Sequence, residues 1–142
     1  MSIGIKEDCM PKEFYSRLGI FSLTLTPEEI DSILELKCDT CYHIGDVRGD
    51  TIICEKENGW IIYSRCAKSS PMKDHVDDLL KRVSSVIDKI RNISDQPDTE
   101  VELGCFFHSK EEPPLFFENN QINVLSKMGA SIDIDMYFWE RD

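Results

Sequence analysis

The residue types and spacing most suited to chemistry lie in the short stretch from Cys38 to His43. Cys38 and Cys41 are separated by two residues, a spacing at which two thiolates can bind one zinc ion. His43 follows them, and Cys9 or Cys54 could complete four ligands. One such pair without a second is a weak zinc signal, so we predict free thiols, no metal and no cofactor. A metal- or thiol-dependent site at Cys38, Cys41 and His43 is the alternative.

Other signals for catalysis are weak. The sequence has no P-loop, GxGxxG fingerprint, HExxH motif or GxSxG elbow. His75 has Asp74 and Asp78 close by, but it lies at the edge of an apolar stripe, which predicts a packed histidine rather than a catalytic one. The many carboxylates identify no acid–base pair, because such a pair needs a raised pKa in a pocket. We therefore predict that the protein is not an enzyme.

A second group of candidate residues alternates along the last predicted strand. One side of residues 132–139 is apolar, and the other side consists of Asp133, Asp135, Tyr137 and Trp139. Carboxylates beside large aromatic residues suit a protein-binding patch, because aromatic side chains anchor interfaces and acids can meet Lys or Arg. Asp46 and Asp50 join the candidates because their predicted loop can reach a partner. An ordinary solvated sheet face is the alternative.

The charge of the chain indicates the kind of partner. Its 142 residues include 27 Asp and Glu but only 16 Lys and Arg, for a formal net charge of -11. Affinity for a phosphate backbone comes from clustered Lys and Arg, so nucleic acid is not an expected partner. A basic protein is expected instead, because opposite charges accelerate encounter and an acidic surface can occupy a site built for phosphates. Solubility alone is the other explanation of the charge.

Length and hydropathy indicate one cytoplasmic domain over residues 1–142. A hydrophobic fraction of 41% supports one core in a chain of this size, and the chain is short for two. No apolar run is long enough to cross a bilayer, and the segment from Met1 to Pro11 lacks the apolar block of a signal peptide. We therefore expect no membrane association.

Three helices are predicted to position these residues, and the longest runs from Pro71 to Ile93. Its apolar residues form one stripe at helical spacing: Val76, Leu79, Leu80, Val83, Val86, Ile87 and Ile90. A shorter helix begins at Thr26-Pro27-Glu28-Glu29, which has the form of a capping box, and ends near Lys37. Another is predicted over Asn119–Lys127, with Gly129 closing it.

Strands are predicted between these helices, at residues 14–25, 51–56, 60–66, 100–108, 115–117 and 132–139. The Asn58-Gly59 dipeptide between the second and third of them predicts a hairpin, because both residues tolerate positive φ. The resulting order is β-α-β-β-α-β-β-α-β. This order predicts an α+β domain in which a long central helix and two shorter helices cover one face of a mostly antiparallel sheet.

The sequence also resembles a bacterial family, the domain-of-unknown-function family numbered 4279. The resemblance covers about residues 13–139 and is most specific over residues 125–137, LSKMGASIDIDMY. It also rests on Thr26-Pro27-Glu28-Glu29-Ile30, Gly45-Asp46, Trp60, Asp74-His75 and Leu79-Leu80.

This resemblance implies a small bacterial cytoplasmic domain. Families of this size and architecture look like the immunity proteins of contact-dependent growth inhibition and related toxin systems, which bind and neutralise a toxin domain. The predicted function is therefore stoichiometric binding of a basic toxin domain, with a nuclease as the expected class. A regulatory domain with another partner is a further alternative.

Overall fold

The fold is built on one five-stranded sheet with the strand order β2-β3-β1-β4-β5. The computed structural model describes residues 12–138. The strands are β1 (Glu13–Ser22), β2 (Thr40–Tyr42), β3 (Asn58–Tyr63), β4 (Thr99–Ser109) and β5 (Ala130–Phe138). Central β1 pairs antiparallel with β3 and β4, and β2 pairs antiparallel with β3. Only β5 is parallel to its neighbour β4, so the sheet is mostly antiparallel, as predicted.

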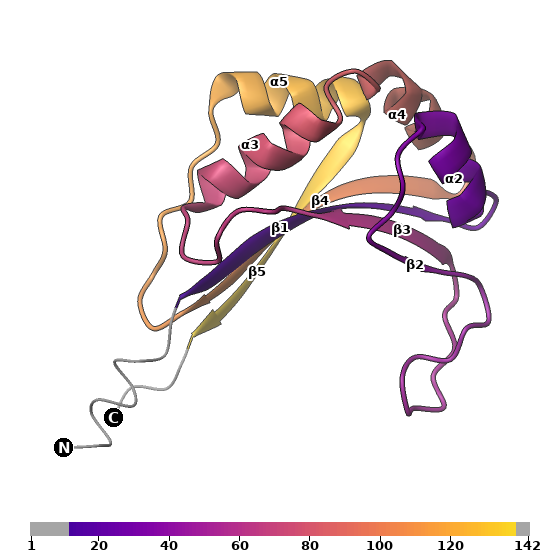
Figure 1. Ribbon diagram of the computed structural model, residues 1–142, viewed down its shortest axis with the longest axis horizontal. Helices are drawn as coiled ribbons and strands as arrows, with labels where there is room; N and C mark the ends of the chain where they lie inside the picture. The colour runs from indigo at the N-terminus through magenta and orange to yellow at the C-terminus, as the bar shows by residue number, and fades with distance from the viewer. Residues whose placement is uncertain (1–11, 139–142) are drawn as a thin grey trace.

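All the described helices lie on one side of this sheet, and the described chain places no layer on the other side (Figure 1). The helices are α2 (Pro27–Leu34), α3 (Met72–Arg82), α4 (Ile87–Ser94) and α5 (Asn119–Met128). The core fills the space between the two layers and includes Leu18, Trp60, Leu79, Ile90 and Leu103, all fully buried. The predicted α+β architecture with helices on one face is confirmed.

Local signals at the helix ends behave as predicted. Thr26 Oγ1 accepts a hydrogen bond from the Glu29 backbone, and Glu29 Oε1 accepts one from the Thr26 backbone, which completes the capping box of α2. Gly129 ends α5 with φ of 72°, a left-handed conformation that costs a glycine little.

The prediction of one long helix over Pro71–Ile93 was wrong, because the segment forms two helices. The apolar stripe is buried as predicted, apart from half-buried Ile87, but α3 ends at Arg82 and α4 begins at Ile87. Ser84 and Ser85 lie in the intervening turn, where Ser84 Oγ donates to the Lys81 carbonyl at 2.8 Å. Serine competes for backbone hydrogen bonds and so favours such a break. The apolar spacing continues through the turn, so periodicity alone does not reveal it.

The predicted hairpin around Asn58-Gly59 was also wrong, because both residues lie inside β3. Residues 43–57 form a loop with one isolated bridge, and β3 pairs with β2 instead. The buried Asn58 amide donates to the Leu25 carbonyl at 3.0 Å and accepts from the Ile44 backbone at 2.9 Å. Gly59 lies opposite Tyr42, whose ring would overlap any Cβ at position 59. Both residues therefore serve tertiary contacts rather than a turn.

The observed element order corrects the prediction accordingly. It is β-α-β-β-α-α-β-α-β, and the second strand along the chain lies at residues 40–42 rather than 51–56. Residues 115–117 form no strand. Pro113 and Pro114 directly precede them and lack backbone donors, which disfavours strand pairing there.

Candidate functional site

The stretch from Cys38 to His43 runs into the edge strand β2. The Cys38 and Cys41 thiols lie near each other in the fold. Burial, followed by the neighbouring Cys41 thiol, raises the pKa of Cys38 to about 12. So high a pKa disfavours the thiolate that a nucleophilic cysteine needs.

His43 is directed toward carboxylates rather than toward these thiols. Its Nε2 lies 2.5 Å from Glu28 Oε1, and its Nδ1 lies 3.6 Å from Asp46 Oδ2. The hydrogen bond to Glu28 is the main cause that raises the pKa of His43. Of the other possible ligands, Cys54 is exposed in the 43–57 loop, and Cys9 lies outside the described residues. Within residues 12–138, no group of three or more His, Cys, Asp and Glu side chains is placed to hold a metal ion.

His75 is packed, in the manner the apolar stripe predicts. It is fully buried, and Ser64 Oγ lies 2.7 Å from its Nδ1. Ser64 Oγ also accepts a hydrogen bond from the Ser16 backbone, so its own proton is available for His75. The His75 Nε2 has no hydrogen-bond partner among the described residues, and burial lowers its pKa. This pair joins α3 to the sheet, and among the described residues no carboxylate hydrogen bonds to His75 to complete a catalytic triad.

The uncovered side of the sheet brings together side chains from all five strands, and we call it the open face. Strand alternation and register assign its members, of which Gly19, Gly59 and Gly104 contribute only backbone. Its larger side chains are Glu13, Tyr15, Arg17, Phe21, Tyr42, Ile61, Tyr63, Glu100, Glu102, Phe106, His108, Asp133, Asp135 and Tyr137.

Aromatic rings form the central part of the open face. Tyr15 and Phe106 stack with their centroids 4.7 Å apart, and Tyr63 lies 6.1 Å from Tyr15. The Arg17 guanidinium lies 5.1 Å from the Phe106 ring centre and 5.8 Å from that of Phe21. These contacts hold the rings in place before any partner arrives.

Carboxylates surround these rings. Arg17 is the one Lys or Arg among the described strand residues of the open face, whereas the acids come from β1, β4 and β5. Burial, and next the charge of Asp133, raises the pKa of Glu102. Asp135 also contributes to a raised pKa of Tyr15, after burial and Tyr63. Acids on this face therefore crowd one another, and a cation placed beside them would relieve the repulsion.

A hollow of about 360 Å³ opens beside β5 on this face. Its walls include the Tyr15 and Phe106 rings and the carboxylates of Glu13 and Asp135. On the β5 side, Tyr137 meets His108 edge to face with centroids 5.3 Å apart. Aromatic faces with carboxylates are the environment that binds an organic cation such as a Lys or Arg side chain.

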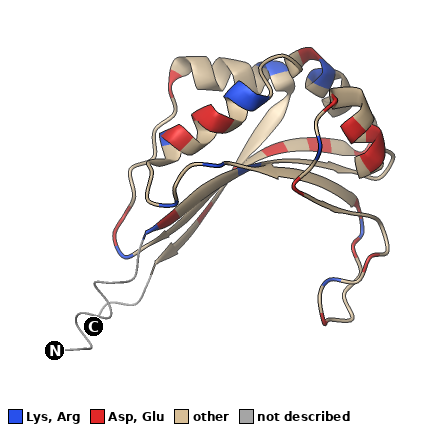
Figure 2. Ribbon diagram, in the orientation of Figure 1, with Lys and Arg blue, Asp and Glu red and all other residues tan. Residues whose placement is uncertain are grey.

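The structure separates the predicted partner-binding residues into two groups. Asp133, Asp135 and Tyr137 lie together on β5 and belong to the open face. Asp46 and Asp50 lie in the 43–57 loop beyond β2, at the opposite edge of the sheet (Figure 1). Trp139 lies outside the described residues. The acids are also spread over α2, α3 and β4, so the net charge is not concentrated in one patch (Figure 2).

Sequence reasoning missed the β1 and β4 contribution to this site. The sequence signal in β1 was the alternation of Tyr15, Arg17 and Phe21 with buried residues. In β4, Glu102 and Phe106 alternate with buried residues in the same way. The same alternation that assigns the β5 residues to one face also predicts which β1 and β4 residues share a face. The stacking of Tyr15 on Phe106 required the β1–β4 register, which only the fold supplies.

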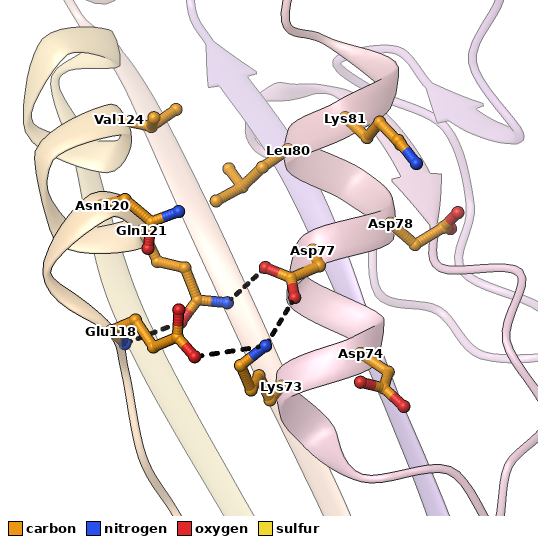
Figure 3. A pocket seen from close by; sticks show the side chains of 10 residues that line it. All are labelled: Lys73, Asp74, Asp77, Asp78, Leu80, Lys81, Glu118, Asn120, Gln121 and Val124. Atoms are coloured by element: carbon orange, nitrogen blue, oxygen red, sulfur yellow. Dashed lines mark hydrogen bonds and ion pairs between the residues drawn. The ribbon is translucent and has the colours of Figure 1, made fainter.

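A second hollow, of about 710 Å³, lies between α3 and α5 (Figure 3). Lys73 Nζ bridges its two walls, at 3.0 Å from Asp77 Oδ2 and 3.2 Å from Glu118 Oε1. Gln121, which is buried, donates to Asp77 Oδ1 at 2.7 Å. These acids are already paired, so the cleft ties two helices together and offers less to a basic partner than the open face.

Comparisons with known proteins agree with the sequence resemblance. The chain matches a family model described as "Domain of unknown function (DUF4279)" over residues 12–139. No curated protein and no solved structure matched the chain. None of the described helices is long and apolar enough to span a membrane. The matched residues include every described helix and strand. The chain therefore belongs to the DUF4279 family.

Proposed function

We propose that this protein binds a basic protein partner through the open face of its sheet. The supporting observation is the uncovered sheet face, on which carboxylates surround a group of aromatic rings. Arg17 is the single Lys or Arg among the described strand residues of this face. Aromatic side chains supply much of the binding energy in protein interfaces, and carboxylates select Lys and Arg.

The rings are held before binding, which favours recognition. Tyr15 stacks on Phe106, and Arg17 lies over Phe106, so these side chains lose little freedom when a partner covers them. Because ordering side chains costs free energy on association, a rigid platform retains more of its contact energy as affinity.

The charge of the whole chain supports the same class of partner. A net charge of -11 repels other acidic proteins and attracts basic ones at long range. Acids spread over several elements raise the encounter rate, while those on the open face select the docked orientation.

Within this class, we propose an immunity-type role in the cytoplasm of a bacterium. The protein would bind the toxin domain of a contact-dependent growth inhibition or related system and block it stoichiometrically. The toxin would be a nuclease, because a nuclease carries a basic site for phosphates that an acidic surface can occupy. This role rests on the acidity of the chain and on an analogy of size and architecture with families of immunity proteins.

The gene that precedes this one provides the experiment. If it encodes a toxin-bearing adhesin or effector, its C-terminal domain is expressed in a sensitive host, with and without this protein. We expect growth arrest by the toxin domain alone, rescue by co-expression, and a one-to-one complex of the purified proteins. Arrest that persists despite soluble, folded protein would contradict the immunity role.

An open-face variant localises the activity in the same assay. Asp135→Asn with Tyr137→Ala removes one charge and one exposed ring from the open face, and we expect rescue to weaken. Asp50→Asn with Ile52→Ala is the matched control, because it removes a charge and an exposed apolar side chain from the 43–57 loop. Equal rescue by both variants would place the binding surface elsewhere.

A further inference from the structure

β5 is an edge strand with one unpaired side. All nine of its residues pair with β4, and no strand lies beyond it among the described residues. Alternate backbone N–H and C=O groups of β5 therefore point away from the sheet. Such groups can form hydrogen bonds with an added strand. The other sheet edge, β2, has only three residues and offers a much shorter template.

The side chains of β5 are accessible as well as its backbone. Ile132 and Ile134 on the helix side of the strand are 41% and 42% exposed, and Phe138 is 51% exposed. Asp133 and Asp135 alternate with them on the open face and are also exposed. β5 thus presents an apolar row on one face and an acidic row on the other.

The acidic row argues against pairing with a second copy of this chain. Two β5 strands paired antiparallel about Ile134 would place Asp133 directly opposite Asp135 of the other copy. Like charges directly opposite each other destabilise a strand pair, and charged edge residues are a common protection against self-association. The same two positions would favour a strand that carries Lys or Arg.

We propose that β5 accepts an added strand from the basic partner, an extended segment in which Lys or Arg alternates with apolar residues. The cations would lie beside Asp133 and Asp135, and the apolar residues would cover Ile132 and Ile134. This inference rests on the proposed function and specifies how the partner docks. Asp135 also lines the hollow beside Tyr15, so a cation paired with this carboxylate would lie at the rim of that hollow.

Short synthetic peptides test the inference without knowledge of the natural partner. One peptide alternates Lys and Val, and its control contains the same residues as a Lys block followed by a Val block. Composition and charge are identical, but only the alternating peptide matches both rows of β5. We expect the alternating peptide to bind more tightly in a fluorescence anisotropy titration.

Amide hydrogen exchange, followed by NMR, reports whether the peptide adds to the sheet. Alternate β5 amides at the free edge should exchange fast in the free protein and become protected when the alternating peptide binds. Binding that leaves β5 exchange unchanged would overturn strand addition, while a basic partner on the open face would still stand.

Charge variants complete the test. Asp133→Asn with Asp135→Asn should weaken binding of the alternating peptide about two- to thirtyfold, which is the effect of losing two cross-strand charge pairs. Glu35→Gln with Asp88→Asn removes the same charge from exposed positions away from β5 and should change little. Equal weakening by both double variants would overturn the inference. If the toxin domain binds but the alternating peptide does not, strand addition alone is overturned. If neither binds, the proposed function is overturned too.

Discussion

The indole of Trp60 donates a hydrogen bond from Nε1 to Asp31 Oδ1 at 2.7 Å, which links β3 to α2. Trp60 is fully buried, and the same carboxylate oxygen accepts the Cys38 backbone N–H at 3.0 Å. The Asp31 side chain therefore accepts hydrogen bonds both from the largest core residue and from the backbone that leads into β2.

Replacing this carboxylate should destabilise the protein. Asp31→Ala leaves a buried indole N–H without an acceptor, which should cost about 1 to 3 kcal/mol in urea unfolding. Asp31→Asn keeps one acceptor oxygen and should cost less. Asp88→Ala, at an exposed position of α4, is the control. A loss no larger for Asp31→Ala than for this control would show that the hydrogen bond adds nothing to stability.

Core truncation should distinguish two neighbouring residues of α3. Leu79 is fully buried, whereas Leu80 is 9% exposed and borders the cleft between α3 and α5. Leu79→Ala should cost about 2 to 5 kcal/mol of unfolding free energy, and Leu80→Ala should cost less because solvent can fill its space. Chemical denaturation of the two variants measures the difference. A larger loss for Leu80→Ala would contradict this packing.

His75 should make stability depend on pH in the acidic range. Burial lowers its pKa below the ordinary 6.5, despite the opposing charges of Asp74 and Asp78. The unfolded chain therefore binds this proton at a higher pH than the folded protein does. The His75 contribution is complete above about pH 6.5 and is lost as pH falls from there through the lower folded pKa.

Comparison with His75→Asn isolates this effect. Both proteins are unfolded in urea at a series of pH values, and the difference between their unfolding free energies is followed. We expect wild type to lose stability faster than the variant as pH falls. Parallel curves would mean that His75 titrates alike in the folded and unfolded chains.

His43 should titrate in the opposite direction. Its pKa is raised, chiefly by the hydrogen bond to Glu28, so it should stay protonated above pH 6.5 in an NMR titration of the imidazole. Any stability that this pair contributes is present below pH 6.5 and lost as pH rises through the higher folded pKa. Glu28→Gln removes the charge and should return the pKa toward its ordinary value. An unchanged titration in Glu28→Gln would exclude Glu28 as the cause.

Association with a basic partner should slow as salt rises. Exposed charges are screened over about 8 Å at physiological ionic strength, so the association rate should fall more than the dissociation rate changes. The two acidic groups can be tested separately, because they lie at opposite sheet edges. Asp133→Asn with Asp135→Asn should slow binding of the cognate toxin domain more than Asp46→Asn with Asp50→Asn does. Stopped-flow kinetics measure both, and a rate insensitive to salt would contradict electrostatic steering.

The sequence by itself determined the features that depend on neighbours along the chain. The Thr26 capping box, the Gly129 helix end and the buried stripe from Val76 to Ile90 were all predictable. Each is a local matter of φ, hydrogen bonds within one turn, or periodic burial of one side. The alternation on β5 likewise predicted which of its residues share a face, and placed Asp133 beside Asp135.

Only the tertiary structure decided the features that depend on distant partners. Asn58-Gly59 has the composition of a turn, yet contacts with Leu25, Ile44 and Tyr42 hold it in a strand. The stacking of Tyr15 on Phe106 arises from strand pairing between residues 91 positions apart in the sequence, which composition does not encode. The edge position of β5 follows from the strand order of the whole sheet, because a strand's exposure depends on which strands pair with it.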